Sequence, residues 1–212
     1  MSTRTILSRV ARLAGAAACA ISLTSCGSEM LRTGRAPMLL VVERMEASPG
    51  NGGPASSFLL SDVQVLVDQT VNGVTKKVAT IFNDSASAQI RVVPKNPSAT
   101  AAEINTVTLT RYHVEFRRTD GRAVPGVDVP FGFDGGLGVS ISPNSSQQVA
   151  FEIVRHQAKL EPPLANLASG GGLGFISTIA EITFYGHDQN GNEVTVTGRI
   201  DVQFGDFADD SK

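Results

Sequence analysis

The sequence of 212 residues is poor in cysteine, in large aromatic side chains and in long hydrophobic runs. It contains two cysteines, two tyrosines and no tryptophan. A helix that spans a bilayer needs about 20 apolar residues. The longest apolar runs are shorter than this: LAGAAACAISL at residues 13–23 and PMLLVV at residues 37–42. The sequence therefore predicts no membrane-spanning helix.

An excess of basic residues is also missing. Lysine and arginine together number 18, against 20 aspartates and glutamates, which gives a formal net charge of −2. Proteins that bind nucleic acid usually present a basic face, because neutralising phosphates releases counterions. Adhesion to anionic lipid through protein charge needs a similar basic cluster. We therefore expect neither nucleic acid as a partner nor membrane binding through charge alone.

The N-terminal segment has the organisation of a secretory signal. Arg4, Arg9 and Arg12 precede the apolar run 13–23, and the first 25 residues contain no acidic side chain. A basic region followed by a short apolar region is typical of a signal peptide that is removed from the mature protein. We expect residues 1–25 to be this signal.

The end of this segment is more specific. Leu23, Thr24, Ser25 and Cys26 resemble the lipobox of bacterial lipoproteins, in which an aliphatic residue and two small ones precede a cysteine. The resemblance implies that the Cys26 sulfur receives a diacylglyceryl group, that cleavage occurs just before Cys26, and that the new N-terminus is acylated. Two or more acyl chains hold a protein stably at a membrane. In that family the absence of aspartate after the cysteine favours the outer membrane of Gram-negative cells.

Cleavage before Cys26 would change both cysteine content and charge. Cys19 leaves with the signal, and a single remaining cysteine cannot form an intramolecular disulfide. Three of the 18 basic side chains and none of the 20 acidic ones are lost, so the net charge moves from −2 to −5. We expect Cys26 and the residues up to 37 to form a lipidated tether, and the domain after it to be stabilised by packing.

Alternation of apolar and polar residues predicts strands along most of the mature chain. The clearest are residues 194–204 and 181–185, joined by GHDQNGNE, whose Asn190-Gly191 pair suits a tight turn with positive φ at both central residues. Gly198, in mid-strand, predicts a bulge or a close approach of another segment. Further strands are expected near residues 38–47, 62–68, 76–83, 88–94, 107–117, 139–142 and 149–153.

Two irregularities are expected as well. The side-chain parity changes between Val107-Leu109 and Tyr112 onward, which predicts a bulge near Thr110 or Arg111. Residues 158–168 could hold a turn or two of helix. With no βαβ rhythm, about seven to nine short antiparallel strands in residues 38–206 predict an all-β, two-sheet sandwich, followed by a polar tail at 207–212.

The predicted sandwich resembles the immunoglobulin and fibronectin III architecture. It lacks the tryptophan, the cysteine pair and the tyrosine corner that mark particular families. The resemblance is therefore to an architecture, which by itself carries no function.

Three long connections are the expected contact regions. Residues 48–61, 119–138 and 156–174 follow odd-numbered predicted strands, so antiparallel pairing would place all three at the pole opposite the tether, where a partner could reach them. Two glycine-rich stretches within these connections, FDGGLG and GGGLG, supply the candidate partner-contact residues: Gly135, Gly136, Gly138, Gly171, Gly172 and Gly174.

No pattern of catalytic or metal-binding residues is evident. His113, His156 and His187 are too scattered for a local metal motif, and the acidic run from Asp188 to Glu193 has its glycine at the fourth position, whereas an EF-hand has it at the sixth. Neither glycine-rich stretch has the Gly-Lys-Ser/Thr ending of a phosphate-binding loop. No nucleophile elbow is present. We expect no cofactor, no metal and no enzymatic activity.

These inferences predict a lipid-anchored protein of the bacterial cell envelope that acts as a binding or structural module. Its partners would be the membrane, through the lipid, and an envelope protein or glycan. The alternative is a lipoprotein that binds a glycan or another small ligand, for which Tyr185, on the polar face of its strand, is the candidate stacking residue.

Overall fold

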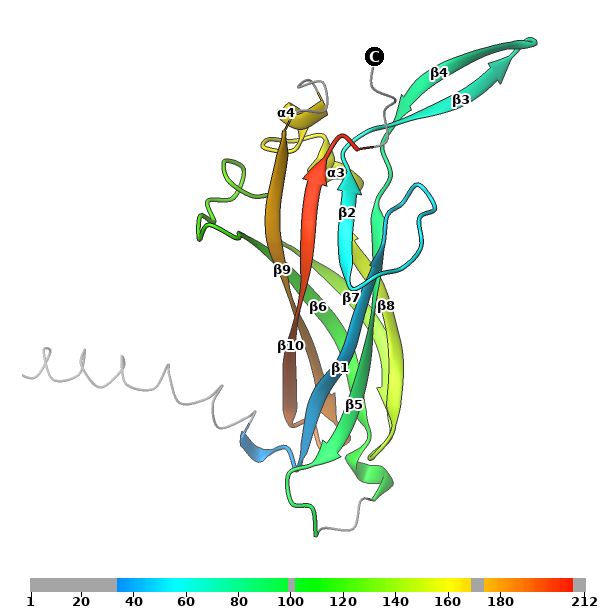
Figure 1. The fold of residues 1–212 in the computed structure, drawn as a ribbon. Coiled ribbons are helices and arrows are strands. Elements are labelled where there is room, and N and C mark those ends of the chain that lie inside the picture. Colours follow the sequence, from blue (N-terminus) through cyan, green and yellow to red (C-terminus); the bar gives the residue numbers. More distant parts are fainter. Residues whose placement is uncertain (1–33, 99–101, 169–173, 208–212) are drawn as a thin grey trace, which may run out of the picture.

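The computed structural model describes residues 34–98, 102–168 and 174–207. Two sheets pack against each other, and a separate two-stranded ribbon projects from one end (Figure 1). The smaller sheet has the order β1(Met38–Ser48), β5(Asp84–Pro94), β8(Ser146–Val154). The larger sheet has the order β2(Phe58–Asp62), β10(Glu193–Gly205), β9(Phe175–Asp188), β6(Val107–Arg118), β7(Phe133–Ile141). The predicted all-β sandwich is confirmed.

Large apolar side chains from both sheets form the core. Phe151 of β8 lies with its ring centroid 5.3 Å from that of Phe184 of β9, and 5.2 Å from that of Tyr112 of β6. Phe116 and Phe204 meet edge to face within the larger sheet's inner face, at 5.6 Å. Aromatic pairs in these geometries add to the free energy gained from burial. Packing thus supplies the stability expected of a domain without a disulfide.

The predicted C-terminal hairpin is present, with a different turn. β9 and β10 pair from Phe175–Gly205 to His187–Glu193 without a break in register. Gly191 has a φ of 78°, but Asn190 does not have a positive φ. The buried Asp188 carboxylate closes the turn instead, because its Oδ1 accepts hydrogen bonds from the backbone N–H groups of Asn190 and Asn192, both at 2.9 Å. The Asp188 side chain therefore shapes the turn.

Two local predictions about the strands are confirmed. The register of β6 shifts between Leu109 and Arg111 against both its neighbours, which is the expected bulge. At Gly198, a Cβ atom would lie 2.3 Å from the sulfur of Met45 on β1. The strand has no bulge there, so Gly198 allows β1 of the opposite sheet to approach closely.

The described residues form ten strands, where about seven to nine were expected, and not all are antiparallel. β2 occupies residues that the sequence assigned to the connection 48–61, and it pairs in parallel with β10. Its sequence, FLLSD, follows the glycine- and proline-rich residues 49–57 and shows little alternation, which concealed it. The parallel β2–β10 pair lies at one edge of the larger sheet.

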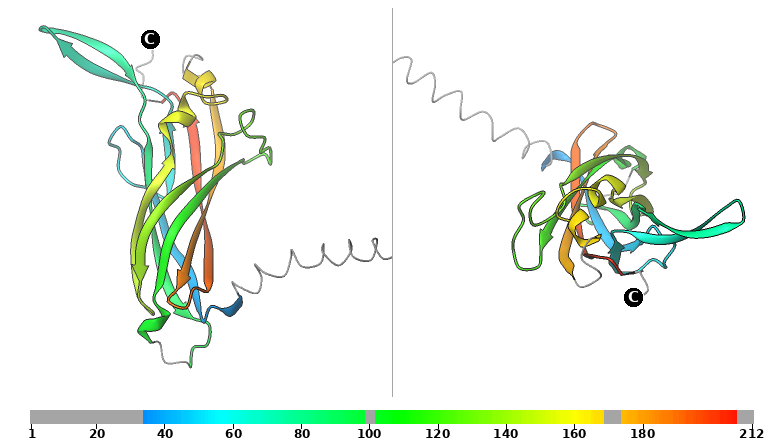
Figure 2. Two further views of the ribbon diagram at one scale, coloured as in Figure 1. Left: turned by 180° about the vertical axis from the view of Figure 1, so that it is seen from behind. Right: turned by 90° about the horizontal axis from the view of Figure 1, so that it is seen from above.

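The ribbon formed by β3(Val65–Val71) and β4(Val74–Thr80) is here called the arm. Its strands pair from Val65–Thr80 to Val71–Val74, around a turn at Asn72 and Gly73 with φ of 54° and 77°. Positive φ at both residues is the hairpin geometry that Asn-Gly favours. The arm extends away from the sandwich with no second layer over it (Figure 2).

A buried lysine holds the foot of the arm. Helix α3(His156–Lys159) follows β8 and places Lys159 between the residues that precede and follow the arm. Its Nζ lies 2.9 Å from Asp84 Oδ2 and donates to the Asp62 carbonyl oxygen at 2.8 Å. Ser61 Oγ and the Gly50 backbone N–H also donate to the Asp84 carboxylate, at 2.6 and 2.8 Å. These bonds compensate for burying both charges.

Candidate binding surface

The long connections gather at one pole of the sandwich. The chain enters β1 at one end, and the segments that follow β1, β6 and β8 leave at the other, together with the arm (Figure 1). The expectation from strand parity is therefore confirmed. It survives the missed strand because β2 runs in the same direction as β1, so it does not reverse the direction of later strands (Figure 1).

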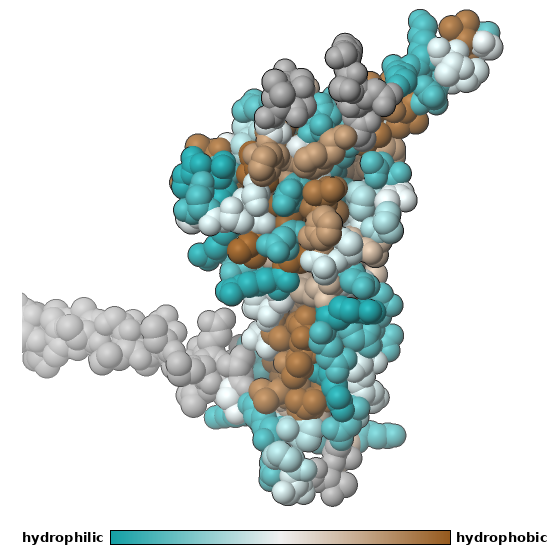
Figure 3. Space-filling model, viewed as in Figure 1, coloured by the Kyte–Doolittle hydropathy of each residue, from teal (hydrophilic) through white to brown (hydrophobic). Residues whose placement is uncertain are grey.

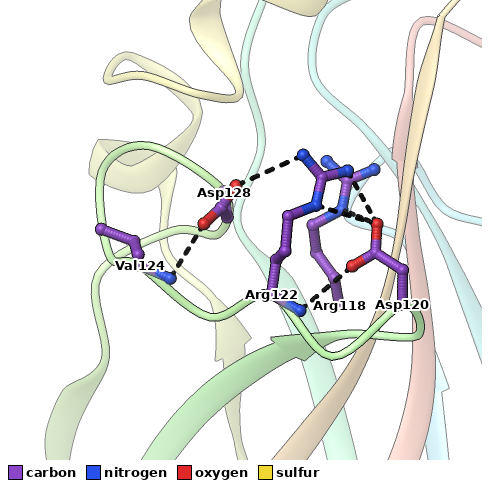
Figure 4. Close-up of polar contacts among 5 residues, drawn as sticks. All are labelled: Arg118, Asp120, Arg122, Val124 and Asp128. Atoms are coloured by element: carbon purple, nitrogen blue, oxygen red, sulfur yellow. Dashed lines mark hydrogen bonds and ion pairs between the residues drawn. The ribbon is translucent and has the colours of Figure 1, made fainter.

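The segment from 119 to 132 is a structured loop at this pole, here called the β6–β7 loop. Figure 4 shows Arg122 at its centre. The Arg122 guanidinium donates to Asp120 Oδ2 from Nε at 3.0 Å and from an Nη at 2.7 Å, and another Nη lies 3.6 Å from Asp128 Oδ1. The Asp128 carboxylate also accepts from the Val124 backbone N–H at 3.2 Å. One arginine thus joins both halves of the loop.

Electrostatics favour this arrangement. The hydrogen bonds from Arg122, followed by the charges of Arg122 and Arg118, lower the pKa of Asp120 from 3.8 to about 2. The hydrogen bond to Asp120 correspondingly raises the pKa of Arg122. Both side chains are exposed to solvent, which screens their attraction, so the network orders the loop more than it stabilises the domain.

The β6–β7 loop also exposes apolar side chains. Val124 and Val127 expose 55% and 70% of their surface on either side of Pro125 and Gly126. Val129 is buried and anchors the loop to the core. A loop that is held in shape by polar contacts while presenting valines to solvent is suited to contact with an apolar partner surface.

A shallow groove lies beside this loop. Its volume is about 180 Å³, and its lining combines apolar and polar residues: Pro130, Phe131, Gly132, Phe133, Arg155, Gln157, Ala158, Glu161 and Pro162. The guanidinium carbon of Arg155 lies 3.9 Å from the centroid of the Phe133 ring, a cation–π contact that fixes one wall. Phe131 is 55% exposed. The groove continues the apolar surface of the β6–β7 loop.

The candidate glycines need correction. Gly135, Gly136 and Gly138 lie in strand β7, at the edge of the larger sheet, and not in a loop. A Cβ atom on Gly135 would lie 2.2 Å from the Tyr112 ring, whereas none of the described atoms lies within 4 Å of such an atom on Gly136 or Gly138. The repeated glycines predict a loop, but they lie in a strand, and one of them, Gly135, makes room for an aromatic ring.

The second glycine stretch is only partly described. Gly174 is exposed and lies just before β9. Gly171 and Gly172 lie outside the described residues. Leu23, Thr24, Ser25 and Cys26 also lie outside them. Within the described residues no helix is long and apolar enough to cross a membrane.

Tyr185 lies on the outer face of the larger sheet, as expected, among charged neighbours. The Arg111 guanidinium carbon lies 3.7 Å from the centroid of the Tyr185 ring, and Arg111 is also 3.0 Å from Asp134 Oδ1. His113 Nδ1 lies 3.3 Å from the same carboxylate oxygen. One face of the Tyr185 ring is therefore covered by an arginine, which reduces the surface on which a sugar could stack.

The histidines are dispersed in the structure as in the sequence. His113 and His187 lie on the outer face of the larger sheet, and His156 begins α3. Among residues 34–98, 102–168 and 174–207, no three histidine, cysteine or carboxylate side chains are close enough to hold a metal ion.

Two features of this pole were missed by sequence analysis. The alternation of Arg118, Asp120 and Arg122 was a signal for the polar network, since opposite charges two residues apart can bond across a tight turn. Asn72-Gly73 between two runs of β-branched residues was a signal for the arm.

Comparison with known proteins gives no functional assignment. No protein-family model matches the chain. No curated protein matches it either. A solved structure, the X-ray structure of the Northeast Structural Genomics Consortium target SoR45, aligns over 80% of this chain and 86% of its own, with 10% sequence identity and a TM-score of 0.32. A similarity this low leaves function to be argued from the chain itself.

Proposed function

We propose that this protein is a lipid-anchored component of the bacterial cell envelope. Its β-sandwich would present the pole that carries the long connections, here called the loop pole, to an envelope partner. The observation that carries the proposal is the separation of the two ends. The lipobox-like stretch leads into β1 at one pole, and the ordered apolar β6–β7 loop with its groove lies at the other. A module anchored at one end would present the opposite end to its surroundings.

The chemistry of the loop pole favours an apolar protein surface as the partner. Val124, Val127 and Phe131 of the β6–β7 loop are each more than half exposed, and Phe131 lines the groove together with Phe133 and Arg155. Exposed apolar residues that gather at one place mark interaction sites more often than scattered ones do. Binding here would rest on burial of these side chains, with Arg155 and Glu161 supplying specificity at the rim.

The alternative, a glycan- or small-ligand-binding lipoprotein, has less support. Arg111 covers one face of the Tyr185 ring, and Tyr185 does not line the groove beside the β6–β7 loop. A sugar would therefore have to displace the guanidinium or use the ring's other face.

The anchor is tested by metabolic labelling of the full chain with an acyl probe. Cys26→Ser should abolish labelling and leave the signal uncleaved, whereas Cys19→Ser, which changes the other cysteine of the leader region, should label normally. Full labelling of the Cys26→Ser chain would refute the anchor.

The partner surface is tested separately by crosslinking in cells. A photo-crosslinking residue in place of Val127 should capture one or a few defined proteins. The same residue in place of Thr195, which is exposed on the outer sheet face, is the matched control. Equal capture at both positions would argue against a binding surface at the loop pole.

A further inference from the structure

The arm has one apolar face and one polar face. Its cross-strand pairs place Val67 opposite Val78 and Val71 opposite Val74 on one side. The other side carries Asp68 opposite Lys77 and Thr70 opposite Thr75, whose hydroxyl groups lie 2.9 Å apart. Side chains alternate between the faces of a strand, so the four valines share one surface of the arm, as two pairs with Gln69 and Lys76 between them. We call this surface the valine stripe.

This stripe has no layer over it in the single chain. The four valines are exposed by 39%, 58%, 57% and 40%, in order along the sequence. An isolated two-stranded ribbon is marginally stable in water, and an amphipathic sheet normally buries its apolar face. The arm is therefore built for a surface that the single chain does not supply.

A complementary surface lies at the foot of the arm. Phe58 and Leu60 of β2 and Phe207 after β10 are exposed by 48%, 42% and 44%. Leu60 and Phe207 line a hollow of about 210 Å³ together with Pro49, Asn51 and Asp62. Figure 3 shows hydrophobic surface around β2 and on the arm in the same view. We call this patch the foot patch.

The charges of the two surfaces are opposite. Lys76 is the one charged residue on the face of the valine stripe, whereas Lys77 lies on the polar side opposite Asp68. Beside the foot patch, Asp201 is the parallel neighbour of Phe58, and Asp206 directly precedes Phe207. Opposite potentials on two apolar surfaces favour their contact and set its orientation.

We propose that two copies of this chain associate by exchanging arms, with the valine stripe of each copy covering the foot patch of the other. A two-fold axis between the copies would place the two arms side by side in opposite directions. Each arm tip, at Val71 and Val74, would then lie at the partner's foot patch. A two-fold contact closes on itself, so the assembly would stop at two copies.

The area of the contact favours a reciprocal exchange over a single one. Each strand of the arm has seven residues, so one face measures roughly 24 by 10 Å and a single arm contact buries about 500 Å² counted on both surfaces. Specific interfaces bury at least about 1,000 Å². Two arm contacts reach that value, whereas one does not.

The mass of the detergent-solubilised full chain tests the proposal, measured by sedimentation equilibrium with the detergent subtracted. We expect a dimer. Val71→Asp, on the apolar face, should weaken association at least tenfold, and Thr70→Asp, one residue away on the polar face, should leave it unchanged. Circular dichroism should show both variants folded, because neither side chain contacts the core.

Three outcomes would overturn the proposal. A monomeric wild-type chain would do so, and so would a dimer that Val71→Asp leaves intact. A mass above two copies that Val71→Asp lowers would indicate a head-to-tail contact in place of a reciprocal one.

Crosslinking identifies the contacting residues. Differently tagged copies carrying Val71→Cys and Leu60→Cys should form a mixed disulfide under mild oxidation. Either variant paired with the unchanged chain controls for the native cysteines, and it should give no such product. An equal product in that control, or none in the test pair, would contradict the proposed contact.

Discussion

The sandwich and the arm use the same alternation of apolar and polar residues and end in different environments. In β9, Ile182 and Phe184 are fully buried between the two sheets, where the ring of Phe184 packs against Phe151 of β8. In the arm, Val65, Val67 and Val71 fall on one face, interrupted by Gln69, but no sheet lies over Val67 and Val71 and they remain exposed. Alternation specifies a strand with one apolar face, and a second layer decides whether that face contributes stability.

The test with the largest expected effect truncates an apolar side chain in each region. Phe184→Ala should lower the free energy of unfolding by about 3–5 kcal/mol, since it leaves a cavity between the sheets. Val78→Ala in the arm should change it by less than about 0.5 kcal/mol. Urea unfolding at a concentration where the chain is monomeric measures both. A cost above about 1 kcal/mol for Val78→Ala would show that the arm packs on its own chain.

Substitution of two neighbouring glycines of β7 should change the stability of the domain by smaller and unequal amounts. Gly135→Ala brings a Cβ atom against the Tyr112 ring and should cost about 1–3 kcal/mol through overpacking. Gly136→Ala meets open space and should be close to neutral. Thermal unfolding of the two variants compares an inward and an outward position of one strand. Equal melting temperatures would mean that Tyr112 moves aside without cost.

The smallest expected effect concerns the β6–β7 loop, which resembles the arm in exposure but is held by charge. Because the pKa of Asp120 is about 2 in the folded loop and near 3.8 when unpaired, its contribution is complete above pH 3.8 and is lost as the pH falls toward 2. NMR titration of the Asp120 carboxyl carbon should show this low pKa. Arg122→Gln should return it toward 3.8, and an unchanged value would mean that another group lowers it.

Sequence patterns predicted those parts of the fold in which the local pattern of residues agrees with the contacts made in the folded domain. The β9–β10 hairpin, the bulge near Arg111 and the pole of the long loops follow from alternation and parity, and all are present. β2 was missed because a short strand that pairs through its backbone with β10 needs little alternation of its own.

The binding surface was harder to predict than the fold. Gly135 was assigned to a flexible loop because glycine suits turns, yet here it receives the Tyr112 ring. The placement of Phe131 beside Arg155 depends on β7 and β8 lying in facing sheets, which no local pattern encodes. Contacts between distant segments of the chain were therefore the part that sequence reasoning lacked.

The lysine beneath the arm has a consequence for the order of folding. The arm is a local hairpin that can close within microseconds of being made. The residues at its foot, however, are held by Lys159, which bonds a carbonyl 97 positions earlier in the chain. During synthesis, the foot of the ribbon would therefore stay unanchored until Lys159 has been added to the chain. A nascent chain would expose the apolar valines of the arm before that anchor forms.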